Sequence, residues 1–233
     1  MIMDLKEAIG RLKELGDPAI VEKKAKKWAV HAVKTLGIHH KELKVLAKEI
    51  GRDDSLGRAL IESDIYEAKL LASKIISPES ITDSEMEEWV LFFDNWEICD
   101  SFSMALFARS SLAHKKITAW YIREEEYVKR AAFATLAGYT MADKLAENEK
   151  FTRYYPLIKS ACTDQRTYVK KAVNWALRSI GKRNPDLRES ALQLSYEILE
   201  IDNKAAKWIA KDAIKELEKD NVRLSNYPRS VYG

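Results

Sequence analysis

One short pattern of residues recurs along this chain and restricts the folds that it can adopt. Each copy begins with tyrosine, has a basic residue three positions later and continues into helical sequence. The copies are Tyr66-Glu67-Ala68-Lys69, Tyr127-Val128-Lys129-Arg130 and Tyr168-Val169-Lys170-Lys171, with a weaker echo at 203–210. The last two copies begin 41 residues apart (127 to 168), and the first two begin 61 apart (66 to 127). A period near 40 residues with two helices in each unit is typical of HEAT-like repeats.

The recurrence therefore predicts an all-α fold in which HEAT-like helical repeats form a curved α-solenoid with a concave groove. We expect residues 1–233 to make a single domain of this kind. Because the tyrosine-led segments put basic residues at equivalent positions along one row of helices, we also expect the groove to be basic. The alternative is an ordinary helical bundle in which the matches arise by chance.

The composition and the breaks between segments agree with a helical chain. Only 8 glycines and 5 prolines occur, which disfavours an all-β fold with many tight turns. The helical periodicity is interrupted at 15–18, 36–38, 51–54, 77–78 and 184–186. Thr82, followed by Glu85, predicts a helix N-cap, and Asp164 is predicted to cap the helix that contains Trp175.

The charge and the cysteine content of the chain limit its possible partners and its cellular compartment. The formal net charge is only +3, so nucleic acid is a permitted partner, but a basic surface must arise from segregated charge. Cys99 and Cys162 lie in apolar helical patterns and predict a reducing compartment without disulfides. No apolar run approaches the ~18 residues needed to span a bilayer, and the first residues lack the apolar block of a signal peptide. We therefore expect a cytoplasmic protein with no membrane partner.

Trp96 and Asp100 lie four residues apart on a predicted helix and face away from its apolar stripe. That stripe consists of Ile98, Phe102, Ala105 and Leu106. Ser103 is expected on the outward face with the pair. An aspartate among aromatic rings in a cleft can stabilise a developing cation or position a water molecule. The alternatives are that Asp100 is solvated or caps its own helix, and that Trp96 packs against a neighbouring helix.

A second outward tryptophan, Trp175, is accompanied by three cations. Lys171, Arg178 and Lys182 lie beside it, away from the predicted core stripe. The stripe consists of Val169, Ala172, Val173, Ala176, Leu177 and Ile180. An aromatic ring within a row of cations suits a flat or anionic ligand, such as the sugars, bases and phosphates of nucleic acid. The alternative is a solvated face whose tryptophan packs against the next helix.

Arg130 is expected on the outer face of its helix, where its neighbours Ala134 and Ala137 are small. A cation with small neighbours allows a phosphate backbone to approach closely. The alternative is an ordinary surface arginine. Lys129, the preceding residue of the same tyrosine-led segment, is assigned to the same DNA-binding group.

Patterns that would hold a metal or a cofactor are missing from the sequence. His31, His39, His40 and His114 have no cysteine or acidic partners at metal-ligand spacing, and the pair at 39–40 is expected at a helix start. No glycine-rich phosphate loop, Gly-x-Ser-x-Gly motif or dinucleotide fingerprint occurs. We therefore expect no cofactor and no metal, and either a cofactor-free reaction or no catalysis.

Two segments carry a resemblance to a known family. They are Asp94-Asn95-Trp96-Glu97-Ile98-Cys99-Asp100 and the stretch 170–178, which reads Lys-Lys-Ala-Val-Asn-Trp-Ala-Leu-Arg. Shorter matches lie at 35–38, 42–51, 66–72, 128–133 and 179–185. Over roughly residues 20–215, the chain resembles the DNA alkylation repair proteins of the AlkD-like superfamily of HEAT-repeat DNA glycosylases.

The resemblance implies an all-helical solenoid that cradles double-stranded DNA. It implies hydrolysis of the N-glycosidic bond of cationic alkylated purines, such as 3-methyladenine and 7-methylguanine, without drawing the base into a pocket. Trp96 and Trp175 would line the sugar and backbone of the lesion, and Asp100 would stabilise the oxocarbenium-like sugar and position the attacking water. Arg130 would hold phosphate, helped by Arg178. A base alkylated at N7 or N3 is already positively charged and leaves without a protonating acid, so a single carboxylate is sufficient.

A second function stays open. Some branches of the superfamily keep the solenoid and bind DNA without excising bases, and Glu97 adds negative charge near the predicted site. The chain would then be a non-catalytic HEAT-like repeat protein that binds unusual DNA structures or a protein partner. The expected partner of the enzyme is double-stranded DNA with alkylated bases, and the expected state is a monomer.

Overall fold

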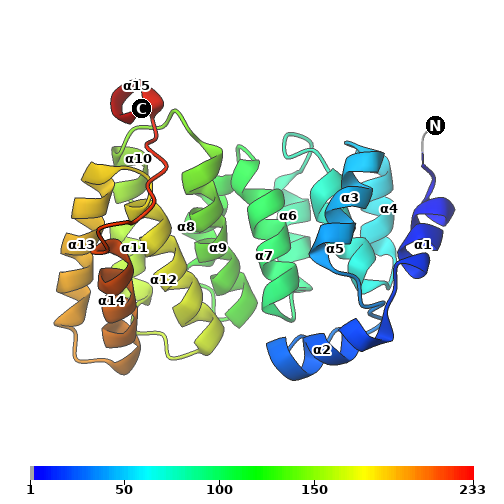
Figure 1. Ribbon diagram of the computed structural model, residues 1–233, viewed down its shortest axis with the longest axis horizontal. Helices are drawn as coiled ribbons and strands as arrows, with labels where there is room; N and C mark the ends of the chain where they lie inside the picture. The colour runs from blue at the N-terminus through cyan, green and yellow to red at the C-terminus, as the bar shows by residue number, and fades with distance from the viewer. Residues whose placement is uncertain (1–2) are drawn as a thin grey trace. The chain divides into compact units, whose positions relative to one another are not determined.

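The computed structural model describes residues 3–233, and the chain divides into two compact units, Met1–Ser111 and Leu112–Gly233. Every regular element within residues 3–233 is a helix, which confirms the predicted all-α class (Figure 1). The units are described one at a time, and the expectation of a single domain over 1–233 stays a prediction. Among the described residues, no helix has both the length and the apolar character that a membrane crossing requires.

The first unit is built around α5. Its elements are α1 (Leu5–Glu14), α2 (Pro18–Trp28), α3 (His40–Ile50), α4 (Asp54–Glu62), α5 (Tyr66–Ile75), α6 (Asp83–Leu91), α7 (Trp96–Ala105) and the 3-10 turn η1 (Phe107–Arg109). Helix α5 packs against α3, α4 and α7, and α1 contacts both α4 and α5. Because α5 has neighbours on several sides, most of its residues are buried, rather than one stripe alone.

The helix starts of the first unit are set by short-range hydrogen bonds. Thr82 Oγ1 accepts from the Glu85 backbone N–H (3.2 Å) and Glu85 Oε2 accepts from the Thr82 N–H (2.8 Å), which confirms the predicted cap of α6. His39 is the N-cap residue of α3, as expected. Asn95 caps α7, because its Oδ1 accepts from the backbone N–H groups of Glu97 (2.9 Å) and of the next residue (3.2 Å). This cap determines where the helix that carries Trp96 and Asp100 begins.

A cluster of aromatic rings fills the core behind α6 and α7. Trp89 is only 3% exposed, which confirms its predicted place in the core. Its ring centroid lies 6.0 Å from that of Phe102, and Phe102 lies 5.4 Å from Phe93 and 5.8 Å from Phe107. Burial of large rings dominates the stability of such a core, so the packed rings hold α7 in position.

The loop between α2 and α3 is held by the carboxylate of Glu67 on α5. Its oxygens accept from the hydroxyl of Thr35 (2.8 Å) and from the backbone N–H groups of Leu36 (2.8 Å) and Gly37 (2.9 Å). Gly37 has a φ of +77°, and a Cβ there would lie 2.2 Å from the carbonyl oxygen of Asp17. Only glycine fits this close approach, and the predicted break at 36–38 is confirmed.

The second unit contains the tyrosine-led segments as neighbouring helices. Its elements are α8 (Ala113–Trp120), α9 (Glu126–Ala142), α10 (Glu149–Thr152), α11 (Tyr155–Ala161), α12 (Thr167–Gly181), α13 (Pro185–Leu199), α14 (Lys204–Leu217) and α15 (Arg229–Tyr232). Helix α9 packs against α12, and α12 packs against α14 (Figure 1). The segments at 127, 168 and 203 therefore begin three successive helices of one row, so the repetition seen in the sequence is structural.

Helix α12 has the predicted core stripe but a different start. All six residues of the stripe from Val169 to Ile180 are fully buried. The predicted cap by Asp164 is wrong, because α12 begins at Thr167 with Arg166 as its N-cap residue. Asp164 lies two residues before Arg166, and its Oδ1 accepts from both the backbone N–H and the Nε–H of Arg166, each at 3.0 Å. The carboxylate is thus engaged by the arginine before the helix begins.

The end of α12 is tied to the C-terminal segment by Arg183 and its neighbours. Arg183 is fully buried, and its Nη2–H donates to the carbonyl of Ala146 (2.9 Å). Its guanidinium carbon lies 4.3 Å from the ring centroid of Phe151. The backbone N–H of Tyr227 donates to the Arg183 carbonyl (3.1 Å), and that of Ser225 donates to the Lys182 carbonyl (2.9 Å). The segment after α14 therefore runs back along the end of α12.

Candidate functional site

Trp96 and Asp100 lie one turn apart on α7, and both are half-buried. Ile98 and Phe102, from the predicted apolar stripe, are buried, so the two faces of the helix were correctly assigned for these residues. The expected outward position of Ser103 is wrong, because this residue is fully buried. Helix α7 has packed neighbours on more than one side, which narrows its exposed face to the strip that includes Trp96 and Asp100.

The indole of Trp96 is held in place by the end of α2. Its Nε1–H donates to the backbone carbonyl of Trp28 at 2.9 Å. Trp28 is the last residue of α2, and the next residue, Ala29, takes the left-handed conformation with φ 52°. Carbonyl groups in the last turn of a helix have no hydrogen-bond donor within that helix. The Trp96 indole therefore supplies the donor for the Trp28 carbonyl. The contact fixes the tryptophan while leaving part of its ring exposed.

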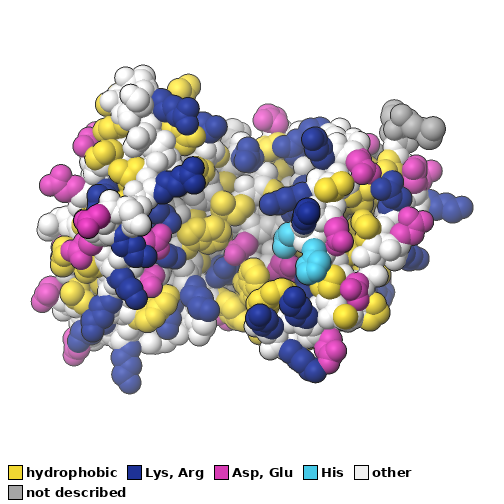
Figure 2. Space-filling model, in the orientation of Figure 1, with side chains coloured by type: hydrophobic (Ala, Val, Ile, Leu, Met, Phe, Trp, Pro, Cys, Tyr) yellow, Lys and Arg dark blue, Asp and Glu magenta, His cyan; other side chains and the backbone are white. Residues whose placement is uncertain are grey.

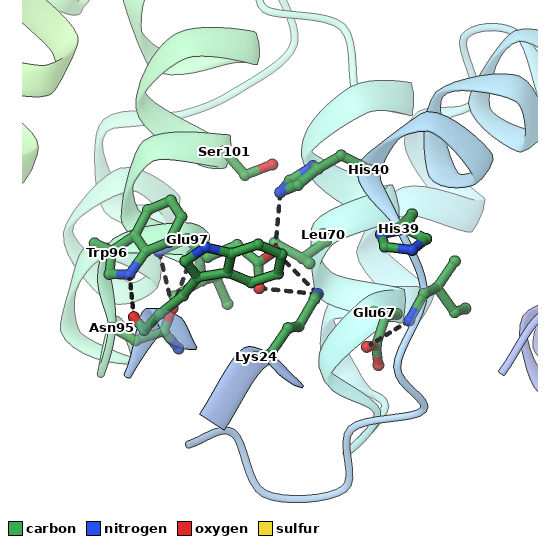
Figure 3. Close-up of polar contacts among 12 residues, drawn as sticks. Lys24, His39, His40, Glu67, Leu70, Asn95, Trp96, Glu97 and Ser101 are labelled. Atoms are coloured by element: carbon green, nitrogen blue, oxygen red, sulfur yellow. Dashed lines mark hydrogen bonds and ion pairs between the residues drawn. The ribbon is translucent and has the colours of Figure 1, made fainter. Parts of the chain in front are cut away.

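Beside Trp96, the carboxylate of Glu97 is the centre of a buried polar network (Figure 3). Lys24 Nζ lies 2.9 Å from Oε1 and 3.0 Å from Oε2, and both side chains are 5% exposed. His40 Nε2 lies 3.1 Å from Oε1. The hydroxyl of Tyr66 donates to the Glu97 carboxylate (3.0 Å), and it lies 2.9 Å from Oδ1 of Asn95. Groups from α2, α3, α5 and α7 meet here.

The network keeps Glu97 ionised. Burial acts to raise the pKa of Glu97, but the hydrogen bond from His40 and the charge of Lys24 outweigh it and hold the pKa at about 2. Burial and the Glu97 charge together raise the pKa of Tyr66 above its usual value. At neutral pH the carboxylate is therefore a full negative charge, matched by the buried ammonium of Lys24.

A cavity of about 410 Å³ opens next to this network. Its lining residues are Lys24, Trp28, His39, His40, Lys41, Glu42, Trp96 and Glu97. Figure 2 shows histidine side chains at the surface in the region of α2 and α3, next to several cations. The cavity is thus walled by indole and imidazole rings, and it has the volume of a small-molecule site.

A second lysine reaches α7 from α5. Lys74 Nζ donates to the hydroxyl of Ser101 at 2.7 Å, and Ser101 Oγ lies 2.9 Å from that of Ser73. Burial lowers the pKa of Lys74 to about 8, and the charge of Lys44 acts in the same direction. Lys74 therefore holds a hydroxyl of α7 in place from α5.

In the second unit, Trp175 is half-buried on α12, within the predicted row of cations. Lys171 lies one turn before it and is exposed. Arg178 forms an ion pair with Glu216 and lies 3.6 Å from Asp212, and Lys182 binds Glu216 at 2.6 Å. Figure 2 shows cations and carboxylates mixed over α12 and α14. Of this row, Lys171 is thus the most accessible cation.

Two further residues assigned to DNA binding, Lys129 and Arg130, lie in the first turns of α9. Lys129 Nζ is 3.4 Å from Oδ2 of Asp164, and both side chains are largely buried. Arg130 is only 6% exposed, and its Nη1–H donates to the carbonyl of Tyr168 at 2.7 Å. Its predicted place on an exposed outer face is therefore wrong, because α12 packs over this side of α9. Its predicted phosphate contact stays a prediction.

Sequence patterns did not identify the Glu97 network. From the sequence, Glu97 is only a negative charge near the site, and His40 is only a residue at a helix start. Lys24 and Trp28 are separated from α7 by about seventy residues of chain (73 between Lys24 and Glu97, 68 between Trp28 and Trp96). One sequence feature could have indicated the network. Lys24 lies one turn after Ile20, on the buried side of α2, and a lysine at such a position predicts a buried partner of opposite charge. Within residues 3–233, no group of three or more His, Cys, Asp or Glu side chains could hold a metal ion.

Comparison with solved structures agrees with a helical-repeat fold. A solved structure described as "a new family of proteins related to the HEAT-like repeat DNA glycosylases with affinity for branched DNA structures" has a TM-score of 0.72. It is 20% identical, over 91% of this chain and 95% of that one. A designed armadillo repeat protein is 14% identical over 89% of this chain and 98% of its own, with a TM-score of 0.40. A search of curated protein sequences finds no match.

The first of these structures establishes the HEAT-like repeat fold, which the sequence predicted. The family model of the DNA alkylation repair enzymes matches residues 8–217, which include both tryptophans and Asp100. The match covers nearly the whole length of both units. This chain therefore belongs to the DNA alkylation repair enzyme family.

Proposed function

We propose that this protein is a DNA glycosylase that releases cationic alkylated purines, including 3-methyladenine and 7-methylguanine, from double-stranded DNA. The proposal is carried by the pairing of Trp96 with Asp100, one turn apart on α7 and both partly exposed. The aromatic ring is fixed by its hydrogen bond to α2, and the carboxylate is the group that the chemistry requires. Membership of a DNA alkylation repair family supplies the class of substrate.

The reaction needs little from the protein because the substrate is already activated. Cleavage breaks the bond between C1′ of the deoxyribose and the base nitrogen, and the electron pair leaves with the base and cancels its positive charge. The sugar becomes an oxocarbenium-like cation, which the Asp100 carboxylate stabilises. A water molecule positioned by Asp100 then adds to C1′ and loses a proton to the carboxylate or to solvent. In this proposal no metal, no cofactor and no base-flipping pocket takes part, and the protein acts as a monomer.

In this proposal each unit contributes its own contacts to DNA. Trp96 in the first unit and Trp175 in the second each offer an aromatic face to the sugar and backbone, and such a face tolerates any sequence. Lys171 supplies exposed positive charge for the phosphates. The proposed phosphate contacts of Arg178, Lys182, Lys129 and Arg130 require these side chains to exchange their present partners for phosphate. Contacts to the sugar and phosphate do not depend on the base sequence, whereas contacts to base edges do. Backbone contacts therefore suit an enzyme that must act on a lesion in any sequence.

The test of the function is base release. Purified protein is incubated with duplex DNA that carries 7-methylguanine, and free base is measured by chromatography against an undamaged duplex. We expect release of 7-methylguanine from the alkylated duplex and none of guanine from the control, because only the cationic base leaves unaided. Intact duplex binding without any release of base would contradict the glycosylase assignment.

A second candidate function is favoured by one observation. The solved structure with a TM-score of 0.72 comes from a family described as having affinity for branched DNA. If this chain shares that property, it is a non-catalytic protein that binds unusual DNA structures. It would then bind a four-way junction more tightly than a linear duplex and release no alkylated base.

We expect Lys171→Ala to weaken binding to every duplex by a similar factor. Its ammonium is exposed beside Trp175, so it provides a sequence-independent phosphate contact. The slope of log affinity against log salt should fall by about 1, as one released counterion predicts. Lys6→Ala, at an exposed position of α1, removes the same charge and should leave the slope unchanged. A loss confined to particular sequences would contradict the phosphate role.

A further inference from the structure

Of the residues that line the cavity of about 410 Å³ beside the Glu97 network, only Trp96 has a part in the proposed reaction. That reaction takes place at the sugar and draws no base into a pocket. The cavity lies wholly in the first unit, between the end of α2, the start of α3 and the start of α7. Its size falls within the ~300–1,000 Å³ of typical small-molecule sites.

The walls of the cavity favour a flat ring. Trp28 and Trp96 come from two different helices, and the hydrogen bond between the Trp96 indole and the Trp28 carbonyl joins their positions. Trp28 keeps 38% of its surface exposed, although burial of a tryptophan is strongly favourable. The rings of His39 and His40 also line the space. Aromatic faces held open in this way are surfaces on which another aromatic ring stacks.

Charge inside the cavity is already balanced. The Glu97 carboxylate is neutralised by Lys24 at 2.9 Å and accepts further hydrogen bonds from His40 and Tyr66. The Glu42 carboxylate accepts from the backbone N–H of His39 (3.1 Å), and Lys41 adds a positive charge to the same lining. The two lysines and two glutamates of the lining thus carry equal and opposite charge, so an uncharged ring fits better than a charged one.

Exposed lysines lie next to the aromatic lining of the cavity. Lys41 is exposed and lines the cavity, and Lys23, exposed on α2, lies 5.7 Å from the ring centroid of Trp28. An apolar, aromatic interior with lysines beside it matches a nucleotide that is part of a strand. The uncharged base lies inside, and the phosphates on either side meet the cations.

We infer that this cavity of the first unit receives one unpaired, uncharged nucleobase of DNA, stacked on the indole of Trp28. Double-stranded DNA supplies such a base wherever it is bulged, mismatched or branched. The inference does not depend on glycosylase activity. It adds a second DNA-recognition site that reads unpaired bases.

The experiment uses a duplex with a single extrahelical 2-aminopurine and a fully paired duplex of the same length. Because 2-aminopurine is not alkylated, no cleavage interferes. Binding to the intact protein is followed by fluorescence anisotropy, and stacking is followed by the fluorescence of 2-aminopurine. We expect the bulged duplex to bind about tenfold more tightly than the paired one, with quenching of the 2-aminopurine, since one base stacked on an aromatic side chain has this effect.

Three variants decide the assignment. Trp28→Ala should lose both the preference and the quenching, whereas Trp28→Phe should keep both, because it retains an aromatic face. Trp208→Ala is the matched control, because Trp208 is 39% exposed and belongs to the second unit. Far-ultraviolet circular dichroism checks that each variant is as helical as the native protein. A preference that survives Trp28→Ala, or a native protein that shows neither preference nor quenching, would overturn the inference.

Failure of this inference and failure of the glycosylase proposal are separate outcomes. The 7-methylguanine assay on the same preparation reports on Asp100 and the sugar, and the 2-aminopurine assay reports on the cavity. Asp100→Asn should leave the 2-aminopurine preference intact, since Asp100 does not line the cavity. A loss of that preference in Asp100→Asn would contradict the inference of a separate base-binding site.

Discussion

Asp100→Asn is expected to reduce the release of 7-methylguanine by at least about a hundredfold while leaving duplex affinity nearly unchanged. Removal of one preorganised electrostatic group from an active site typically costs about 10²–10³ in rate, and here the group is a full charge. The asparagine side chain has nearly the same shape, so contacts of α7 are preserved. Single-turnover release of base and equilibrium binding are measured on the same alkylated duplex.

A control is needed because the removal of any carboxylate from a DNA-binding protein alters its electrostatics. Glu88→Gln makes the same change of charge at an exposed position of α6, in the same unit. Its release rate should equal that of the native protein. The proposed role of Asp100 is contradicted if Asp100→Asn loses duplex binding along with activity, or if its rate matches that of Glu88→Gln.

Glu97→Gln is expected to lower the free energy of unfolding by about 3 kcal/mol, since removal of one partner of a buried ion pair leaves an uncompensated charge. The ammonium of Lys24, in a side chain that is only 5% exposed, would lose its counter-ion. Urea unfolding at neutral pH measures the change. Glu22→Gln breaks the exposed Glu22–Lys26 pair, whose side chains are 66% and 74% exposed, and should cost under about 1 kcal/mol.

The pH dependence of stability provides a second measurement of the same pair. The pKa of Glu97 is held at about 2, below the ordinary glutamate value of 4.5, so the unfolded state binds its proton more readily. The stabilisation is therefore complete above about pH 4.5 and is lost as the pH falls towards 2. The shift corresponds to about 3 kcal/mol as an upper limit, and this increment should be missing from Glu97→Gln. Equal losses of stability for Glu97→Gln and Glu22→Gln, or identical acid profiles for native protein and Glu97→Gln, would show that the pair does not stabilise the fold.

Much of the fold follows from the order of residues along the chain. The scarcity of glycine and proline, the breaks between segments and the tyrosine-led repeats predicted helices that the structure contains. Helical spacing also placed Trp96 and Asp100 on one side of α7, and Trp175 among cations on α12. These predictions succeed because residues three or four apart on a helix are neighbours whatever surrounds the helix.

Other features were decided only when the helices packed together. Arg130 was expected to be exposed and is buried beneath α12, and Ser103 lies on a second packed side of α7. An amphipathic pattern identifies the main buried face of a helix, but not a further face that a neighbouring helix covers.

The sequence by itself thus determined the all-helical class, the repeat and the spacing of the candidate catalytic pair. The tertiary structure alone decided that Lys24 and His40 meet Glu97, and that Trp28 and Trp96 enclose a cavity. The physical reason is how far apart along the chain the interacting residues lie. Helix periodicity is local, whereas an ion pair between residues 73 positions apart depends on how α2, α3, α5 and α7 pack around one another.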